Sequence, residues 1–401
     1  MHTLAPPFGL YVHIPFCPQR CPYCAFTILT GHTELYERYV AAVCTEIRSW
    51  HHLASKGPLH TVFFGGGTPS LLAPAQIQRI LHTAVSTFGL AAHAEVTLEA
   101  NPTTADAQHF AAFHARGITR LSLGVQSFHD IDLQTLGRWH SAADAETAYR
   151  IARQVGFTNV SIDVIFSIPG ATRQRWQTTV ERLLDLAPEH ISTYALTIEE
   201  GTRFARREHQ GHLTPVTEED DAWAYAWVME TLASAGYQHY EVSNFARPGY
   251  RSQHNWGYWH GADYLGVGLS AHSLLDGQRH WNRRGLHAYL TAVEAGQAPQ
   301  AGAERLDAVA ARLERLWLQL RTCTGVIFQP QELQVLLSDP KFQAMLDKGL
   351  LHLHDTTVHL TPAGFLFADA IGVEVAALLE RAAAGTQRPT AGAHNGKKGH
   401  T

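Results

Sequence analysis

The stretch GLYVHIPFCPQRCPYC, residues 9–24, decides the fold of this chain. Its first half is an apolar run typical of a β-strand, and its second half is a short loop with Cys17, Cys21 and Cys24 in the spacing C-x3-C-x2-C. Thiolates are soft ligands that favour zinc, copper(I) or iron–sulfur centres. A cubane [4Fe–4S] cluster with three protein thiolates keeps one iron open for a further ligand. The loop therefore predicts a metal centre at the end of a strand.

A zinc site is the alternative for these cysteines, with a distant ligand such as His13 to complete it. Zinc motifs usually pair two C-x2-C or Cys/His units, and the sequence has no second unit. The remaining cysteines have different surroundings, since Cys44 lies in a helical pattern and Cys323 lies beside a turn. We expect both to be small buried hydrophobic residues.

Composition describes an ordinary globular protein of 401 residues, with 45% hydrophobic and 17% charged residues. A net charge of −5 gives no electrostatic argument for nucleic acid or an anionic membrane as a partner. Five cysteines, three of them close together, do not form a secreted disulfide framework. The sequence has neither a signal peptide pattern nor an apolar run of about eighteen residues. We therefore expect a cytoplasmic protein with no membrane span, and its oligomeric state stays open.

The first half of the chain alternates β-rich apolar runs with amphipathic helical patterns, which predicts βα units and a parallel sheet. The expected strands are residues 10–16, 61–64, 95–99, 120–126, 161–166 and 191–197, and the expected helices are residues 34–50, 74–87, 105–116, 142–155 and 174–186. Six such units favour a partial (β/α)6 barrel over a full eight-fold barrel. A doubly wound open sheet is the structural alternative.

The chemically unusual residues lie at or near the ends of these strands. The run Gly65-Gly66-Gly67-Thr68-Pro69 follows the second strand, while Glu99 and Gln126 end the third and fourth. Asp163 lies in the fifth strand and Ala195 in the sixth. Barrel enzymes build their sites at the carboxyl ends of the strands, so six segments converge on one predicted location.

Several of these features also have structural interpretations. A glycine run by itself is often a strand-to-helix turn. Glu99 could form a buried ion pair with Arg120. In the run HNWGYW, residues 254–259, His254 could ligate haem iron while the rings pack on the macrocycle, or the aromatic residues could form a structural lid.

The second half of the chain has a different character. An acidic helical pattern over residues 218–235 leads into aromatic and glycine-rich sequence. We expect four parts: an α/β core over residues 1–235, an extension with HNWGYW over 236–300, a small winged-helix-like α+β domain over 301–382 and a disordered tail over 383–401.

Taken together, the motifs resemble the radical S-adenosylmethionine (SAM) superfamily. More narrowly, they are similar to its oxygen-independent coproporphyrinogen III oxidase-like branch, which includes haem chaperones. The resemblance covers about residues 9–375. The matching stretches are YVHIPFC at 11–17, Cys21, Tyr23, Cys24, GGGTP at 65–69, GVQS at 124–127, LGR at 136–138, Asp163, YEVSNFA at 240–246 and HNWGYW at 254–259.

This resemblance implies a partial radical-SAM barrel, a cofactor set and a site. Cys17, Cys21 and Cys24 would hold a [4Fe–4S] cluster, whose open iron binds SAM. His254 would be the haem-iron ligand. The residues implied around SAM, some of which would line a second site instead, are Tyr11, Tyr23, Gly66, Gly67, Thr68, Glu99, Gln126, Arg138, Asp163 and Ala195. No catalytic residue is assigned.

Two departures separate this chain from the oxidases of that branch. The oxidases carry the motif C-x3-C-x2-C-x-C, whereas Phe26 stands here at the position of the fourth cysteine. The oxidases also have a longer leading segment that closes over the porphyrin substrate, whereas only sixteen residues precede Cys17 here. We therefore expect a haem chaperone that binds the [4Fe–4S] cluster, SAM and haem and delivers haem to client haemoproteins. The alternative is the oxidase activity, a radical decarboxylation in porphyrin biosynthesis. Nucleic acid is not an expected partner.

Overall fold

The structure, a computed structural model, describes residues 8–104 and 106–386, and its centre is a twelve-stranded mixed sheet. Six neighbouring parallel strands follow chain order across this sheet without reversal. They are β1 (Gly9–Ile14), β4 (Leu59–Gly66), β5 (Leu90–Ala100), β6 (Arg120–Gln126), β7 (Val160–Phe166) and β8 (His190–Ala195). In a barrel, neighbouring strands follow one another in chain order, whereas in a doubly wound sheet the direction of the strand order reverses at a switch point. The partial barrel is confirmed, and the doubly wound alternative is wrong.

Six further strands extend the sheet at both edges, and the sequence analysis did not predict them. On one side β11 pairs parallel with β1, and three antiparallel strands follow. On the other side β10 and β9 pair antiparallel beyond β8. Their bounds are β9 (Gln238–Glu241), β10 (Asn244–Ala246), β11 (Tyr264–Val267), β12 (His272–Leu275), β13 (Gln278–Asn282) and β14 (Gln300–Arg305). The region expected as an extension therefore completes the barrel sheet.

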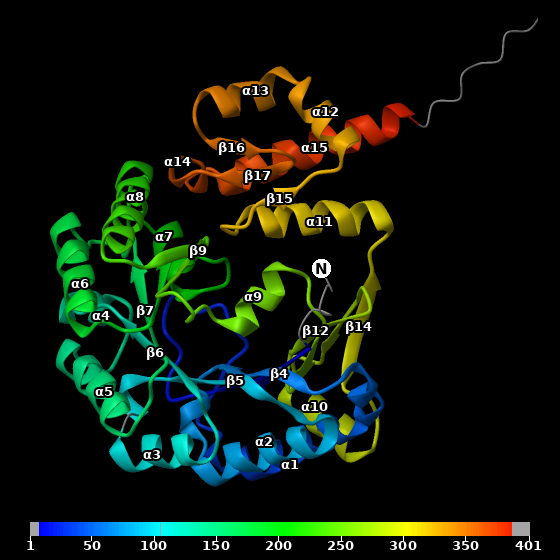
Figure 1. Cartoon of the computed structure of the whole chain (residues 1–401). Coiled ribbons are helices and arrows are strands. Elements are labelled where there is room, and N and C mark those ends of the chain that lie inside the picture. Colours follow the sequence, from blue (N-terminus) through cyan, green and yellow to red (C-terminus); the bar gives the residue numbers. More distant parts are fainter. Residues whose placement is uncertain (1–7, 105, 387–401) are drawn as a thin grey trace, which may run out of the picture. The chain divides into compact units, whose positions relative to one another are not determined.

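Amphipathic helices cover the outer face of the curved sheet (Figure 1). In α1, for example, Val40, Val43 and Ile47 are fully buried. The helices between β1 and β8 are α1 (Tyr36–Ser49), α2 (Pro74–Phe88), α3 (Ala107–Ala115), α4 (Asp130–Thr135), α5 (Ala142–Gln154) and α6 (Arg173–Leu186). Five of them match the predicted helices to within two residues, and α4 was not predicted. Residue 105, where the third helix was expected to begin, lies outside the described residues.

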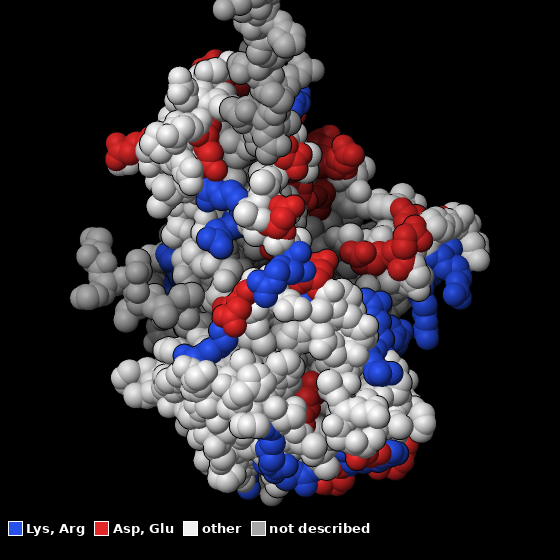
Figure 2. Space-filling view, turned by 90° about the vertical axis from the view of Figure 1, so that its right-hand side faces the viewer, with Lys and Arg blue, Asp and Glu red and all other residues white. Residues whose placement is uncertain are grey.

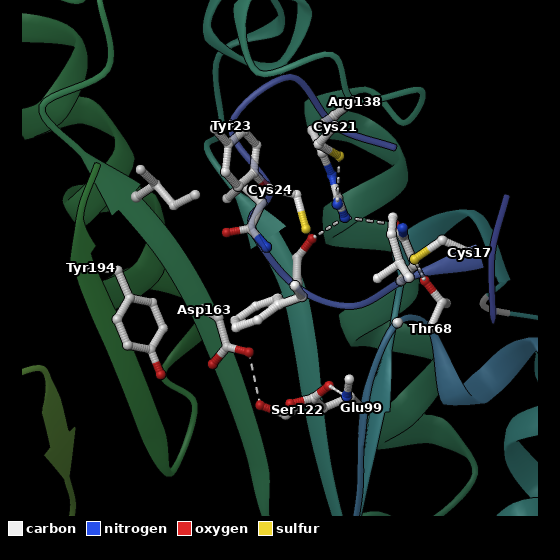
Figure 3. A pocket seen from close by; sticks show the side chains of 18 of the residues that line it. Cys17, Cys21, Tyr23, Cys24, Thr68, Glu99, Ser122, Arg138, Asp163 and Tyr194 are labelled. Atoms are coloured by element: carbon white, nitrogen blue, oxygen red, sulfur yellow. Dashed lines mark hydrogen bonds between the residues drawn. The ribbon is translucent and has the colours of Figure 1, made fainter. Parts of the chain in front are cut away.

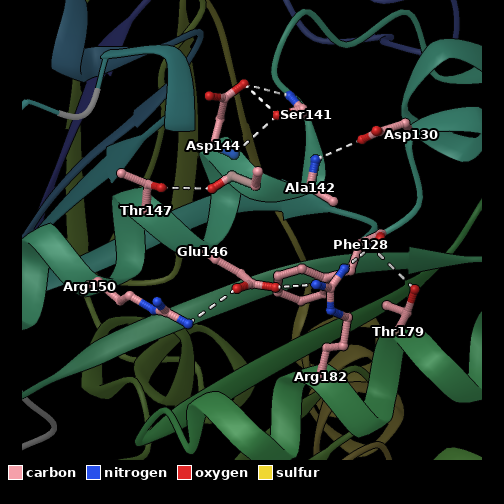
Figure 4. Close-up of polar contacts among 11 residues, drawn as sticks. Phe128, Asp130, Ser141, Ala142, Asp144, Glu146, Thr147, Arg150, Thr179 and Arg182 are labelled. Atoms are coloured by element: carbon pink, nitrogen blue, oxygen red, sulfur yellow. Dashed lines mark hydrogen bonds and ion pairs between the residues drawn. The ribbon is translucent and has the colours of Figure 1, made fainter.

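The start of α5 shows how local sequence sets an element (Figure 4). The backbone N–H of Asp144 donates to Ser141 Oγ, and the N–H of Ser141 donates to the Asp144 carboxylate, with N–O distances of 3.1 and 2.8 Å. This reciprocal pair is a capping box, which satisfies two otherwise free donors at a helix start. Within α5, Glu146 then forms ion pairs with Arg150 and with Arg182 of α6.

The short helix α9 (Gln253–Trp259) contains most of the HNWGYW run and lies on the concave side of the sheet (Figure 1). The buried carboxylate of Glu95 on β5 accepts hydrogen bonds from the backbone N–H groups of Gln253 and His254, at 3.0 and 3.2 Å. A carboxylate at this end complements the unpaired N–H groups of a first helical turn. Glu95 therefore anchors α9 near the amino ends of the barrel strands.

A second buried carboxylate joins α1 to the edge strands. Glu46 accepts hydrogen bonds from the backbone N–H of Gly268 at 2.8 Å, from the Tyr289 hydroxyl at 2.6 Å and from the Asn282 amide at 2.5 Å. Burial raises the pKa of Glu46 to about 7, although these three donors oppose the rise. Tyr289 belongs to α10 (Leu286–Glu294).

Two compact units divide the chain between Arg315 and Leu316. The first also contains α7 (Arg203–His209) and α8 (Glu218–Ser234), and α11 (Ala308–Leu320) spans the boundary. The second has a three-stranded sheet in the order β15-β17-β16 with helices around it. Its elements are β15 (Val326–Ile327), α12 (Pro330–Leu337), α13 (Pro340–Asp347), β16 (Leu351–His354), β17 (Thr357–Leu360), α14 (Pro362–Phe365) and α15 (Ala368–Thr386). Residues 387–401 of the expected tail lie outside the described residues.

None of the described helices is long and apolar enough to cross a lipid bilayer. Figure 2 shows one face of the molecule, on which lysine and arginine side chains alternate with aspartate and glutamate in small groups between uncharged areas. Nucleic-acid binding depends on an extended positive surface that neutralises phosphates, and this face presents none.

Candidate functional site

A cavity of about 550 Å³ lies at the carboxyl ends of the barrel strands (Figure 3). The structure brings most of the predicted site residues together around it, from the cysteine loop and from the ends of β4 to β8. Those that line it are Cys17, Cys21, Tyr23, Cys24, Gly66, Gly67, Thr68, Glu99, Gln126, Arg138, Asp163 and Ala195. Its size is within the range of small-molecule sites.

The backbone of the glycine run holds the cysteine loop in place. The N–H of Gly67 donates to the carbonyl of Ile14 at 2.8 Å, and the N–H of Thr68 donates to the carbonyl of Phe16 at 2.7 Å. This approach is so close that a Cβ on Gly67 would lie 2.5 Å from the Phe16 oxygen. Only glycine fits there, so Gly67 has a steric role whatever binds above it.

Two of the cysteine sulfurs have a polar neighbour from outside the cysteine loop. Cys17 Sγ lies 3.3 Å from the Thr68 hydroxyl, and Arg138 donates to Cys21 Sγ at 3.7 Å. Burial raises the pKa of Cys17 to about 11 and also raises the pKa of Cys24. In the metal-free protein these two thiols are therefore protonated, and because the thiolate is the metal ligand, metal binding must release their protons.

The donor set fits a cluster better than a single metal ion. Among the described residues, no three histidine, cysteine or carboxylate side chains lie close enough to hold one ion. His13, the fourth ligand of the zinc alternative, has both ring nitrogens in use, with Tyr11 Oη at 3.0 Å and with the Thr27 carbonyl at 2.9 Å. Three cysteines around one cavity, with sulfurs too far apart for one ion, suit a larger iron–sulfur centre.

Glu99 faces the cavity from the end of β5 and accepts a hydrogen bond from the backbone N–H of Gly66 at 3.0 Å. Burial and, to a smaller extent, the charge of Asp163 raise the pKa of Glu99 to about 7, against the opposing effect of the Gly66 hydrogen bond. The charge of Arg120 also lowers the pKa of Glu99, but no ion pair joins the two side chains among the described residues, so the ion-pair interpretation of Glu99 is not confirmed. With this pKa, Glu99 changes between its neutral and its charged form near neutral pH.

Asp163 on β7 is held by serine hydroxyls from three strands. Its carboxylate accepts from Ser122 of β6 at 2.8 Å, from Ser161 at 2.9 Å and from Ser192 of β8 at 2.6 Å. These three hydrogen bonds satisfy acceptor positions of a carboxylate that is partly buried. They also fix its direction toward the cavity (Figure 3).

Arg138 and Gln126 complete the rim beside the cysteine loop. Arg138 donates to the carbonyl of Gly124 and to the side-chain oxygen of Asn101, both at 2.9 Å. Gln126 has a positive φ of 71° at a register shift between β6 and β7. Strained backbone of this kind is often found at functional sites, where the surroundings hold it.

Two predicted residues, Tyr11 and His254, do not line this cavity. His254 is buried, and its two ring nitrogens bond to Thr61 Oγ1 and Tyr258 Oη, each at 2.7 Å. Burial and then the charge of Arg120 lower the pKa of His254 to about 3. In this conformation the imidazole is neutral and its nitrogens are occupied. The iron-ligand role of His254 stays a prediction, while its neighbour Asn255 does line the cavity.

The sequence analysis missed several lining residues. They include Asn101, Arg120, Ser122, Trp139, Ser192 and Thr197. A signal was present in β6, whose sequence RLSLGVQ alternates polar or small residues with apolar ones. Alternation in a barrel strand places one set inside, so Arg120, Ser122 and Gly124 could have been assigned to the cavity along with Gln126.

Comparison with known proteins relates this geometry to a family. Residues 11–183 match the model of the Radical SAM superfamily. The chain is 37% identical over 369 residues to the protein named "Heme chaperone HemW" of Mycobacterium tuberculosis strain H37Rv, covering 91% of this chain and 94% of that protein. It is 38% identical over 271 residues to the protein of the same name from Escherichia coli K12, covering 67% and 70%.

The structure of coproporphyrinogen III oxidase (HemN) from Escherichia coli, a radical SAM enzyme, has a TM-score of 0.79 with this chain. The identity is 24%, and the match covers 92% of this chain and 90% of that one. This likeness shows a shared fold.

The contact between Gly67 and Phe16 gives a prediction for the cysteine loop. Gly67→Ala should displace the loop, lower stability by about 1–3 kcal/mol and reduce the iron and sulfide retained after anaerobic reconstitution. Gly285→Ala is the matched control, because a Cβ there meets its nearest atom at 3.8 Å. Equal iron content in both variants would show that the loop does not depend on this contact.

Proposed function

The chain belongs to the HemW family of the radical SAM superfamily, and from this premise we propose that it binds a [4Fe–4S] cluster, SAM and haem and delivers haem to client haemoproteins. One observation carries the proposal. Three cysteines and the polar ends of five strands surround one cavity of about 550 Å³, in a chain with a relative of nearly equal length named as a haem chaperone.

Cys17, Cys21 and Cys24 would hold the cluster. When bound, it supplies electrons and an open iron for an additional ligand. Arg138 donates to Cys21 Sγ and would place a positive charge beside the cluster. Gly67 and Thr68 keep the loop against the rim through their backbone hydrogen bonds.

SAM would bind beside the cysteine loop, where acceptors and donors alternate. Gly66 and Gly67 permit close approach to the backbone. Glu99 and Asp163 offer carboxylates to a molecule that carries a sulfonium, an ammonium and two ribose hydroxyls. The other residues that we propose for this site are Tyr23, Thr68, Gln126, Arg138 and Ala195, whereas Tyr11 does not line the cavity.

Haem is the proposed cargo, and two aromatic rings support its placement at the cavity. Phe26 and Trp139 both line it, yet their side chains are 69% and 67% exposed. Large exposed aromatic rings on the wall of a cavity offer flat apolar surface to a macrocycle. Ligation of the haem iron by His254 requires in addition that α9 release the imidazole from Thr61 and Tyr258.

The test combines haem uptake with the competing enzyme activity. Purified, reconstituted protein should contain about four irons per chain, bind haem in a titration followed at the Soret band, and transfer it to an apo-haemoprotein. The same preparation should form no protoporphyrinogen from coproporphyrinogen III with reductant and SAM under anaerobic conditions. Formation of protoporphyrinogen without haem transfer would contradict the chaperone function and support the oxidase activity instead.

The pKa of Glu99 gives a prediction for the pH dependence of SAM binding. Below about pH 7 Glu99 is protonated, and above it the carboxylate attracts the cationic sulfonium, so affinity for SAM should rise about three- to tenfold from pH 6 to pH 8. Glu99→Gln should lose this part of the rise. Glu230→Gln, an exposed change on α8, should keep it. A steep rise in Glu99→Gln, measured by calorimetry, would assign it to another group.

The two hydrogen bonds of His254 give a prediction for haem ligation. His254→Ala should shift the Soret band and weaken haem uptake, whereas Tyr258→Phe frees Nε2 and should strengthen uptake about fivefold, since one hydrogen bond of about 1 kcal/mol no longer has to be broken. If both variants lose thermal stability but keep the wild-type haem spectrum, His254 has only its role in the barrel interior.

A further inference from the structure

Arg120 is a buried cation that has no hydrogen-bond or ion-pair partner in the described part of the chain. Its side chain is 2% exposed at the start of β6, and it lines the cavity. Its Nε is buried without a hydrogen-bond partner, and the guanidinium forms no hydrogen bond or ion pair with any residue that the structure describes. An unpaired charge in the interior is costly to folding, so its presence calls for an explanation.

The neighbouring acceptors in the cavity are directed elsewhere. One oxygen of Glu99 accepts from Gly66, and Asp163 accepts from three serines. The charge of Arg120 lowers the pKa of Glu99, but no hydrogen bond joins the two side chains. Thr97, which is opposite Arg120 in the register of β5 and β6, also has a buried hydroxyl oxygen without a partner. Two strands thus present unpaired polar groups at one level of the barrel interior.

The charge of Arg120 also acts on its surroundings. After burial itself, it is a cause of the lowered pKa of both His190 and His254, so these imidazoles are neutral. The other arginine that lines the cavity, Arg138, already donates to Cys21, Asn101 and Gly124 beside the cysteine loop. The guanidinium of Arg120 is the positive group that the inner part of the cavity offers to a ligand.

We propose that Arg120, which lines the inner part of the cavity, binds a carboxylate of the cavity's ligand. A guanidinium presents parallel N–H donors that match a carboxylate in a bidentate manner. This assignment rests on the haem-binding function proposed above, and the carboxylate is then a propionate of haem. Arg120 is then a binding residue that selects free propionates over esterified or missing ones.

The experiment compares haem with haem dimethyl ester, in which both propionates are masked. Wild-type protein should bind haem about 10- to 100-fold more tightly than the diester, as expected for a charge-assisted hydrogen bond. Arg120→Gln should lose this preference, and Arg120→Lys should keep part of it. Arg150→Gln, on the exposed side of α5, is the matched control and should behave as wild type.

A second measurement separates binding from a structural role. Because the charge is unpaired, ligand-free Arg120→Gln should unfold at the same denaturant concentration as wild type or at a higher one. Its affinity for SAM should be unchanged. A clear loss of stability would make Arg120 structural, and a selective loss of SAM binding would assign it to the SAM carboxylate. Either result overturns the proposal.

Two outcomes distinguish the role of Arg120 from haem binding by the protein as a whole. If wild-type protein takes up no haem at all, the chaperone function falls and the propionate assignment falls with it. If wild type and Arg120→Gln bind haem and its diester equally well, only the role of Arg120 is refuted, and haem binding stands.

Discussion

Two backbone hydrogen bonds, from Gly67 to Ile14 and from Thr68 to Phe16, carry the geometry of the whole site. They join the loop after β4 to the loop after β1, and only a residue without a Cβ permits the distance. Further contacts hold the cysteine loop as well, such as the hydrogen bond from the Phe204 N–H to the Pro22 carbonyl at 3.0 Å. The parallel register of β1 and β4 is the reason that these two loops meet. The geometry of the site therefore depends on the pairing of β1 with β4 as well as on the cysteines.

The buried carboxyl groups of this chain are held in distinct ways. Burial raises the pKa of Glu46, Glu99 and Glu241 to about 7 in each case. Glu46 is surrounded by donors and joins a helix to edge strands, whereas Glu99 faces the cavity. Proteins tolerate such groups where structure or function requires them, because each unsatisfied one lowers stability. Of the three, only Glu99 lines the cavity where a ligand could reach it.

Sequence alone predicted the parts that depend on local patterns. The bounds of β6 were predicted residue for residue, and the cysteine loop and the strand ends were placed around one site. The edge strands were missed, because the pairing of β11 with β1 joins residues about 250 positions apart and leaves no local alternation. The surroundings of His254 were missed for the same reason, since its partner Thr61 lies on a distant strand. Arg120 was readable from alternation in β6, but its lack of a partner required coordinates.

Burial of Cys17 and Cys24 has a consequence for their reactivity. Oxidants and disulfide exchange attack the thiolate, and the raised pKa values of these two thiols keep the thiolate population small at neutral pH. Both sulfurs therefore react slowly with peroxide and form sulfenic acid slowly. The burial that places them at the cavity thus also lowers their sensitivity to oxidation.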